Sequence, residues 1–400
     1  MRSPLLPIFL TVFVDVLGLT LILPLLPYYA KDYGASDFQV GLLTSVYAIA
    51  MFISGPILGR ISDRVGRKPV LLASQLGTLI GWLVLAFSPS LEMLFVGRII
   101  SGLTAGNLST AQAYISDVTK ANEERTQAFG FFGIAFGLGF VLGPGITGLL
   151  TKSFADHADK LAKYRAPTLT AAGLSLLAIL LTVFLLRPSK PAVRQSVTGR
   201  SSALVQFFTR PRTRALLGQF FLFSVSFAGL TGGLALYLQH NFQFGVEEAS
   251  MIFGLSGFIG ALVQGGLRKL AKKFGEERLA MVGLGSMAAG YFFLGPARHI
   301  AMLLVLVVVG SFGAAVVRPS LTTLITKAVA EEEQGSVLGV SQSLGSLAQA
   351  MGPAATTWLI GRDQITLFGV FCGGFSLLGC IVAAWRDRTD GIANQAHAEG

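Results

Sequence analysis

Two charged residues stand alone within long apolar runs of this 400-residue sequence. Asp15 lies in the run of residues 5–28, and Arg98 lies in the run of residues 92–116. If both runs are membrane-spanning helices, a rise of ~1.5 Å per residue puts the two charges at depths about 5 Å apart, within reach of an arginine side chain. A buried carboxylate whose cationic neighbour changes can take up and release a proton, so the pair is a candidate for proton coupling. The alternative is a static ion pair that holds two helices together.

Other polar residues within apolar runs are candidates for a substrate cavity. Arg318 precedes Pro319 in the run of residues 300–326, with no obvious carboxylate nearby. It could attract an anionic group of a substrate, bond to backbone carbonyl groups that Pro319 leaves unpaired, or extend to the membrane surface. The remaining candidates are amides that could instead join helices by hydrogen bonds: Asn107, Gln112, Gln219, Gln239, Gln342 and Gln349.

The elements that position these residues are predicted to be membrane-spanning helices. Hydrophobic residues make up 52% of the chain and charged residues 13%, which is too little polar surface to cover a water-soluble core. A spanning helix needs about 20 predominantly apolar residues. Apolar runs predict twelve such helices, at residues 5–28, 40–59, 70–88, 92–116, 126–150, 168–186, 215–239, 249–267, 279–296, 300–326, 335–360 and 364–385. The predicted fold class is an all-α polytopic membrane protein.

The distribution of basic residues predicts the orientation and the division of the chain. With the N-terminus inside, 22 of the 31 Lys and Arg fall in inside segments and 7 in outside loops, as the positive-inside rule requires. Both termini are therefore expected in the cytoplasm, with the chain in the inner (plasma) membrane. The predicted units are a six-helix bundle (1–187), a cytoplasmic linker (188–214), a second six-helix bundle (215–386) and a short cytoplasmic tail (387–400).

The two halves of the sequence resemble each other at an offset of 209 residues. An even number of predicted helices separates the two copies, so both run in the same direction through the membrane. Parallel repeats of this kind are typical of large secondary transporters, whose substrate site lies between the halves. The matched positions are Gly66 with Gly275, Gly130 with Gly339, Gly143-Pro144 with Gly352-Pro353, and Glu123-Glu124 with Glu332-Glu333.

A short charged loop, Gly59-Arg-Ile-Ser-Asp63-Arg64-Val-Gly66-Arg67-Lys, connects the second and third predicted helices. The glycine near its end permits a sharp turn, and the basic residues hold the loop in the cytoplasm. Its one carboxylate, Asp63, can pair with Arg67 or lie near the positive N-terminal end of another helix.

The fifth predicted helix is rich in small residues, with Gly139, Gly143, Pro144 and Gly148 in one segment. Small residues let neighbouring helices approach closely, and the proline bends the helix. Ordinary glycine-rich packing is the alternative to a functional motif.

These motifs resemble those of the major facilitator superfamily. The loop is similar to the signature G-x-L-x-D-R-x-G-R-K, with Ile61 in place of Leu, and the fifth helix is similar to the antiporter motif G-x-x-x-G-P-x-x-G-G, with Thr147 in place of one Gly. The first half resembles tetracycline-efflux and related drug:proton antiporters over most of its length. The resemblance implies the major facilitator fold, with two six-helix halves related by a parallel pseudo-two-fold axis.

The resemblance also implies roles for residues of the loop. Asp63 and Arg67 would form a latch between the halves that breaks during transport, with Asp117 as the partner of Arg67. Gly59, Arg64 and Gly66 complete the loop motif. In the second half Lys272 stands at the position of Asp63, so we expect a one-sided latch.

Departures from the tetracycline-efflux pattern bear on the substrate. Gly81 stands where those proteins have an acid, Met51 stands where they have Gln, and their histidine in the eighth helix has no counterpart in residues 253–266. These positions are tied to tetracycline binding or its proton exchange. The resemblance therefore implies a more apolar cavity for hydrophobic or amphipathic compounds rather than for tetracycline itself.

The expected function is proton-coupled efflux of small lipophilic or amphipathic compounds by alternating access. The alternatives are a proton-coupled uptake symporter for a small metabolite and a non-transporting membrane sensor. The sequence has no Walker-type phosphate loop and no residue arrangement typical of a catalytic nucleophile, so nothing in it suggests an enzyme. A gradient must therefore supply the energy for transport. The net charge of +10 resides in short loops, so we expect no nucleic-acid partner, and Cys372 and Cys380 indicate neither a metal nor a cofactor. The expected partners are a small-molecule substrate, protons and the lipid bilayer, with the chain a monomer.

Overall fold

The computed structural model describes residues 5–106, 110–111, 113–115, 122–159, 161–186, 207–330 and 333–398. These residues form helices and connections, and they contain no strand. Nine of the helices in the described part of the chain are long and apolar enough to cross a membrane. The predicted all-α polytopic membrane protein is confirmed. The helices are α1 (Leu5–Asp32), α2 (Asp37–Val65), α3 (Arg67–Ala86), α4 (Leu91–Leu103), α6 (Asn122–Ser153), α7 (Ala162–Leu185), α9 (Pro211–Phe242), α10 (Val246–Phe274), α11 (Glu276–Phe292), α12 (Ile300–Lys327), α13 (Gln334–Ile360) and α14 (Ile365–Ala398).

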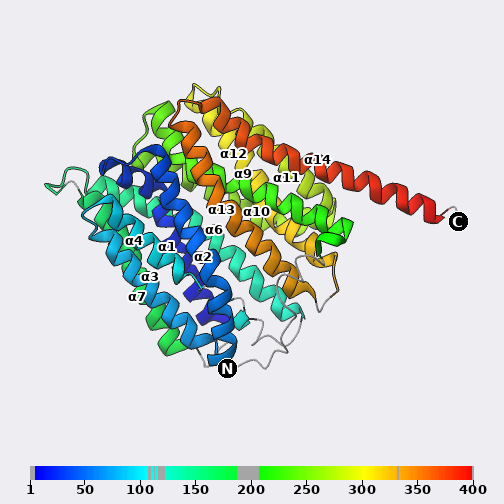
Figure 1. Ribbon diagram of the computed structural model, residues 1–400, viewed down its shortest axis with the longest axis horizontal. Helices are drawn as coiled ribbons and strands as arrows, with labels where there is room; N and C mark the ends of the chain where they lie inside the picture. The colour runs from blue at the N-terminus through cyan, green and yellow to red at the C-terminus, as the bar shows by residue number, and fades with distance from the viewer. Residues whose placement is uncertain are drawn as a thin grey trace.

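Successive helices run in opposite directions, so their ends define two faces of the molecule (Figure 1). The N-terminal face holds the starts of α1, α3, α6, α9, α11 and α13. The far face holds the ends of these helices and their connections to the next helix. The last part of α14 continues beyond the bundle as a projecting helix (Figure 1).

The helices form two bundles whose packing repeats. α1, α2, α3, α4, α6 and α7 pack together, as do α9 to α14. The contact of α1 with α6 recurs as α9 with α13, and that of α3 with α4 recurs as α11 with α12. The bundles meet where α2 packs on α13 and where α6 packs on α10. Because α2 corresponds to α10 and α6 corresponds to α13, the relation between the halves turns the first of these contacts into the second. The predicted pseudo-two-fold relation between two halves is therefore confirmed.

Two glycines confirm the repeat at the level of the backbone. Gly66 joins α2 to α3 with φ +96°, and Gly275 joins α10 to α11 with φ +78°. Only glycine adopts this left-handed region readily, so both copies of the turn need it.

The linker between the halves falls mostly on residues 187–206, which lie outside the described residues. The next helix, α9, begins at Pro211, four residues before the predicted start at 215. Proline suits the first turn of a helix because its missing N–H group would have no partner there. The domain boundaries at 187/188, 214/215 and 386/387 stay predictions.

The prediction of one continuous helix over residues 92–116 is wrong in part. α4 ends at Leu103, and residues 110, 111 and 113–115 are helical again. The Thr104 hydroxyl donates a 2.8 Å hydrogen bond to the Ile100 carbonyl, a local bond that competes with helix continuation. The break packs on α3, because a Cβ on Gly77 would lie 2.1 Å from Cγ2 of Thr104. Hydrophobicity alone does not reveal such a break.

Glycines bring neighbouring helices together within each bundle. A Cβ on Gly290 of α11 would lie 2.6 Å from the backbone nitrogen of Gly310 on α12. Helices in lipid gain no hydrophobic free energy from association, so close backbone packing is a main source of their attraction. Large apolar side chains such as Leu149, Phe184 and Val305 are exposed instead and form the lipid-facing surface.

Candidate transport site between the two halves

Arg98 is enclosed where the two bundles meet. Its residue is only 4% exposed, and its guanidinium carbon lies 4.3 Å from the centre of the Tyr47 ring on α2. Gly102, one turn along α4, permits this approach, since a Cβ there would lie 2.5 Å from the Tyr47 carbonyl oxygen. The buried Nε of Arg98 has no hydrogen-bond partner among the residues that the structure describes. A cation over an aromatic ring gains about 0.5–2 kcal/mol, whereas desolvating an ion costs several kcal/mol, so the charge is incompletely compensated.

Arg98 borders a small cavity between the bundles. The cavity has a volume of about 40 Å³, and Arg98 is its single charged lining residue. The volume is close to the ~30 Å³ that one water molecule occupies in the liquid. In this conformation the cavity therefore fits a small polar group rather than a whole substrate. The other lining residues are Ile22, Leu23, Leu26, Pro27, Thr44, Thr231 and Gly232, from α1, α2 and α9.

Asp15 lies on α1, and one of its carboxylate oxygens is buried. Arg98 contacts the Tyr47 ring, and the described residues show no ion pair between Arg98 and Asp15 in this conformation. Asp15 makes interactions of its own within the protein. The roles of Asp15 and Arg98 in proton coupling stay predictions.

The amides predicted as cavity residues have different surroundings. Gln219 of α9 is fully buried, and within the described part of the chain neither polar atom of its amide group has a hydrogen-bond partner. Gln239 of the same helix is half-buried near the far face. Gln342 is exposed on α13. Asn107 and Gln112 lie outside the described residues, so their role as cavity residues stays a prediction.

Arg318 on α12 is exposed in this conformation. The Arg318 carbonyl group accepts a 2.8 Å hydrogen bond from the Thr322 hydroxyl, one turn further along α12. The proposed roles of Arg318, as a substrate ligand or as a structural cation, stay predictions.

The loop after α2 contains the predicted ion pair. Nη1 of Arg67 lies 2.6 Å from Oδ1 of Asp63, and Nη1 also donates to the Ser62 hydroxyl at 3.0 Å. The Arg67 side chain is buried, whereas the Asp63 side chain is 41% exposed. Arg64 is exposed, and a Cβ on Gly59 would meet no atom within 4 Å. Asp117 lies outside the described residues, so its pairing with Arg67 stays a prediction.

The glycine motif of α6 packs on α1. A Cβ on Gly143 would lie 2.1 Å from the Thr20 hydroxyl oxygen, and that hydroxyl donates a 2.8 Å hydrogen bond to the Gly139 carbonyl. Thr147, which replaces a glycine of the family pattern, donates to the Leu21 carbonyl at 2.7 Å. The replacement of this glycine by Thr147 therefore adds a hydrogen bond between α6 and α1. Pro144 is buried within the helix.

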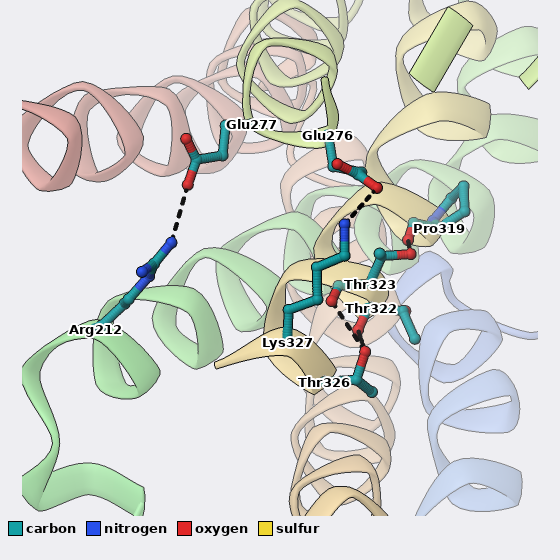
Figure 2. A network of polar contacts seen from close by, with 8 residues as sticks. All are labelled: Arg212, Glu276, Glu277, Pro319, Thr322, Thr323, Thr326 and Lys327. Atoms are coloured by element: carbon teal, nitrogen blue, oxygen red, sulfur yellow. Dashed lines mark hydrogen bonds and ion pairs between the residues drawn. The ribbon is translucent and has the colours of Figure 1, made fainter. Parts of the chain in front are cut away.

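The second half carries ion pairs at the N-terminal face that the sequence did not predict. Lys327 of α12 donates to Glu276 at 2.8 Å, and Arg212 of α9 donates to Glu277 at 3.3 Å (Figure 2). Glu276 occupies the position that corresponds to Arg67, so the charge is reversed. Both ion pairs lie within the second half, so the expected one-sided latch between the halves stays a prediction. The offset of 209 residues places Lys272 and Glu276 at the positions of Asp63 and Arg67, but Glu276 pairs with Lys327 of α12 instead.

The halves are joined at the far face. The Tyr28 hydroxyl donates to the Phe244 carbonyl at 3.0 Å, and Lys152 of α6 pairs with Glu247 of α10 at 2.8 Å. Asp37 of α2 lies 3.5 Å from Nε2 of His240 on α9, an ion pair when the imidazole is protonated. The described residues form no hydrogen bond or ion pair between the bundles at the N-terminal face. The sequence gives no indication of these partners because each pair is more than 90 residues apart.

Residues 8–353 match the sequence profile of the Major Facilitator Superfamily, and residues 268–399 give a second, overlapping match. The chain belongs to this superfamily. Its relatives include the class C tetracycline resistance protein of Escherichia coli, 31% identical over 95% of this chain and 96% of that protein. Multidrug resistance protein 1 of Bacillus subtilis is 28% identical over 85% of each chain.

A solved structure supports the same assignment. The human organic anion transporter MFSD10 superposes with a TM-score of 0.73 at 25% identity, over 96% of this chain and 99% of that one. A peptide-family transporter at 14% identity superposes with a TM-score of 0.80 and shows the shared fold alone. The chain is thus a multi-pass membrane transporter of small molecules, related to tetracycline and multidrug resistance proteins.

Proposed function

We propose that the chain exports small lipophilic or amphipathic compounds in exchange for protons, as a monomer in the inner membrane with both termini in the cytoplasm. The observation that carries the proposal is the enclosed Arg98 at the junction of the halves, over the Tyr47 ring and on the wall of a cavity between the bundles. A membrane transporter that lacks a nucleotide site needs an ionisable group of this kind to use a proton gradient. The names of the resistance relatives favour export.

Asp15 is the proposed proton carrier, and Arg98 adjusts its proton affinity. Asp15 belongs to α1, whereas Arg98 belongs to α4 and borders a cavity whose opposite wall is α9 of the second half. A movement between the halves would therefore change the surroundings of Arg98 and, through them, the proton affinity of the Asp15 carboxyl group. Proton binding and conformation are coupled in this way without a direct ion pair.

The contacts between the halves support alternating access. Those at the far face join α1, α2 and α6 to α9 and α10, so this conformation is closed on that side. The positive-inside rule identifies the N-terminal face as cytoplasmic. The proposed cycle alternates between this conformation and one in which the N-terminal ends meet instead.

The register of α2 against α13 supports a specific N-terminal contact. The two helices are antiparallel, and the close approaches of Gly41 to Thr357 and of Gly361 to Asp37 fix their register at the far face. The same register, continued to the other end, brings Arg64 opposite Gln334, the first residue of α13 and the chain neighbour of Glu333, and brings Asp63 opposite Gly335 in the first turn of α13. A carboxylate is stabilised at a helix N-terminus, so Asp63 and Arg64 would form the latch when the N-terminal ends close.

The substrate is proposed to differ from tetracycline. The tetracycline-efflux pattern has an acid where this chain has Gly81, and a Cβ at Gly81 would already lie 2.0 Å from the Ser101 hydroxyl oxygen. There is no room for a carboxylate at this position. The cavity next to Arg98 is lined mainly by apolar side chains, which suits hydrophobic compounds.

Uptake of an anionic metabolite is a second candidate, favoured by one observation. Arg318 is exposed within the bundle, and a cation there could bind an anionic group. The solved relative MFSD10 is named as an organic anion transporter.

Proton flux in proteoliposomes tests both candidates. A pH-sensitive dye inside the vesicles reports flux when lipophilic cations, neutral drugs or organic anions are added against an imposed gradient. Wild type is compared with Asp15→Asn and with the matched control Asp32→Asn, whose carboxylate lies at the far face and accepts from Tyr164 at 2.8 Å. Export predicts that flux is lost in Asp15→Asn and kept in Asp32→Asn. Equal flux in both variants would exclude Asp15 as the proton carrier. Movement of substrate and protons in the same direction would contradict export and support uptake.

A further inference from the structure

An apolar groove crosses the boundary between the two halves at the far face. It has a volume of about 430 Å³ and is lined by Phe38 of α2 and by Ala354, Ala355 and Trp358 of α13. Phe38 is 43% exposed and Trp358 is 42% exposed, so part of each residue is open to the surroundings. The two walls of the groove belong to different halves.

The groove opens toward the bilayer rather than toward the interior. Leu347, Met351 and Trp358 are exposed along one side of α13, and Ala354 shares that side by helical spacing. The exposed Gln342 and Gln349 lie on the opposite side. An apolar exposed stripe of a membrane-spanning helix faces lipid, whereas its polar stripe faces the interior.

The apolar exposure continues along the other wall. On α2, Ile49, Phe52 and Ile53 are exposed on the same side as Phe38. Both lipid-facing stripes therefore converge at the groove, and its natural occupant is a hydrocarbon chain.

A cation stands next to the groove. The guanidinium carbon of Arg362, just after the end of α13, lies 4.1 Å from the ring centre of Trp358, and Arg362 is exposed. Tryptophan and arginine at a helix end are typical of the level where headgroups meet the acyl chains.

Arg362 differs from the other described cations of the far face. Lys31, Lys152, Lys163 and Arg165 each pair with a carboxylate, and Arg298 donates to the Asn241 side chain. Among the described residues no carboxylate lies within ion-pair distance of Arg362. Its guanidinium group therefore remains available for an anion at headgroup depth.

We propose that the groove binds a membrane lipid with an anionic headgroup, with an acyl chain between Phe38 and Trp358 and the phosphate on Arg362. Because its walls come from both halves, the site is complete only while α2 and α13 are together at the far face. Bound lipid therefore favours this conformation. This consequence rests on the proposed alternating access, whereas lipid binding itself does not.

Tryptophan fluorescence gives a direct readout. The chain has three tryptophans, and Trp82→Phe with Trp385→Phe leaves Trp358 alone beside the groove. The purified protein is titrated with phosphatidylglycerol or phosphatidylcholine that carries bromine on the acyl chain, which quenches a ring in contact with it. We expect half-maximal quenching at an about fivefold lower fraction of phosphatidylglycerol, the contribution of one basic residue to an anionic lipid.

Two variants separate the contribution of the lipid headgroup to binding from that of the acyl chain. Arg362→Gln should remove the preference for phosphatidylglycerol, whereas Lys152→Gln, a far-face cation paired with Glu247, should keep it. Ala355→Leu should reduce quenching by both lipids because it fills the groove. Equal quenching by both lipids in the protein that keeps Trp358 and Arg362, or a preference for phosphatidylglycerol that survives Arg362→Gln, would overturn the proposal. The measurement needs no transport, so it stands or fails independently of the proposed export.

Discussion

The guanidinium carbon of Arg98 lies 4.3 Å from the centre of the Tyr47 ring, a contact that joins α4 to α2 inside the first half. An aromatic face attracts a cation without fixing it by directional hydrogen bonds. Arg98 can therefore keep this contact while its distance to a carboxylate changes. The arrangement explains how a buried cation is tolerated without a permanent ion pair.

Substitution of Arg98 should separate stability from transport. Arg98→Gln removes an incompletely compensated buried charge, so the thermal stability is expected to stay the same or to rise. Proton-coupled transport should fall by at least about tenfold, corresponding to ~1.4 kcal/mol, if Arg98 acts on the proton carrier. Melting temperature and dye-reported flux, measured on the same preparations, check this prediction.

The partner of Arg98 provides the matched comparison. Tyr47→Phe keeps the ring and should retain most of the flux, whereas Tyr47→Leu removes the cation–ring attraction of about 0.5–2 kcal/mol and should reduce it. Equal loss in both variants would assign the effect to the hydroxyl group rather than to the ring.

The sequence predicts the framework well where a local rule applies. Apolar runs of about 20 residues indicate spanning helices, and a glycine that recurs after 209 residues indicates a repeated turn, as Gly66 and Gly275 confirm. The Asp63–Arg67 ion pair is also local, since the two residues are four positions apart in the sequence, on either side of the Gly66 turn. Each of these features depends on residues close together in the chain.

The rest depends on packing between distant segments. Tyr47 becomes the neighbour of Arg98 only because Gly102 admits the α2 backbone, and no periodicity indicates that approach. The pairing of Lys152 with Glu247 requires the two halves to be placed against each other. The break after Leu103 arises from side-chain hydrogen bonding and a contact with Gly77, in a segment whose hydrophobicity is uninterrupted.

Gly41 should control how closely the halves approach at the far face. A Cβ there would lie 2.0 Å from the Thr357 hydroxyl oxygen and 2.7 Å from the Pro353 carbonyl oxygen, and the backbone cannot move aside. Gly41→Ala is therefore expected to destabilise this conformation by about 1–3 kcal/mol, as overpacking does. Thermal unfolding measures the effect. Gly145→Ala, which meets no atom within 4 Å, is the control, and equal melting temperatures for the two variants would contradict the packing argument.

Engineered disulfides should trap the two ends of α2 in different conformations. A Cβ on Gly361 would lie 2.9 Å from Cβ of Asp37, so Asp37→Cys with Gly361→Cys needs only a small adjustment to reach the ~3.8 Å of a disulfide. The cross-link should form readily, stop transport and release it again on reduction. Gel mobility and flux before and after reduction give the result, in a Cys372→Ala and Cys380→Ala background.

The opposite end of α2 tests the alternate state. Arg64→Cys with Glu333→Cys should cross-link slowly in the resting protein and faster when a substrate and a proton gradient drive the cycle. A rate that does not respond to turnover would rule out the proposed approach of these residues.

Arg210 should make the stability of the N-terminal face depend on pH. Its guanidinium group bonds to both carboxylate oxygens of Glu333, at 2.6 and 2.9 Å, and holds the pKa of Glu333 below its usual value. A carboxyl group with a lowered pKa in the folded state contributes stability above its unfolded pKa of about 4.3, and this contribution disappears as the pH falls through the lower folded value. Arg210→Gln should therefore lower the melting temperature slightly at neutral pH and have no effect at a pH below the folded pKa. The pair is exposed to solvent, so the difference should also shrink in high salt. A melting-temperature difference that is independent of both pH and salt would show that Arg210 acts through packing at the start of α9 rather than through its charge.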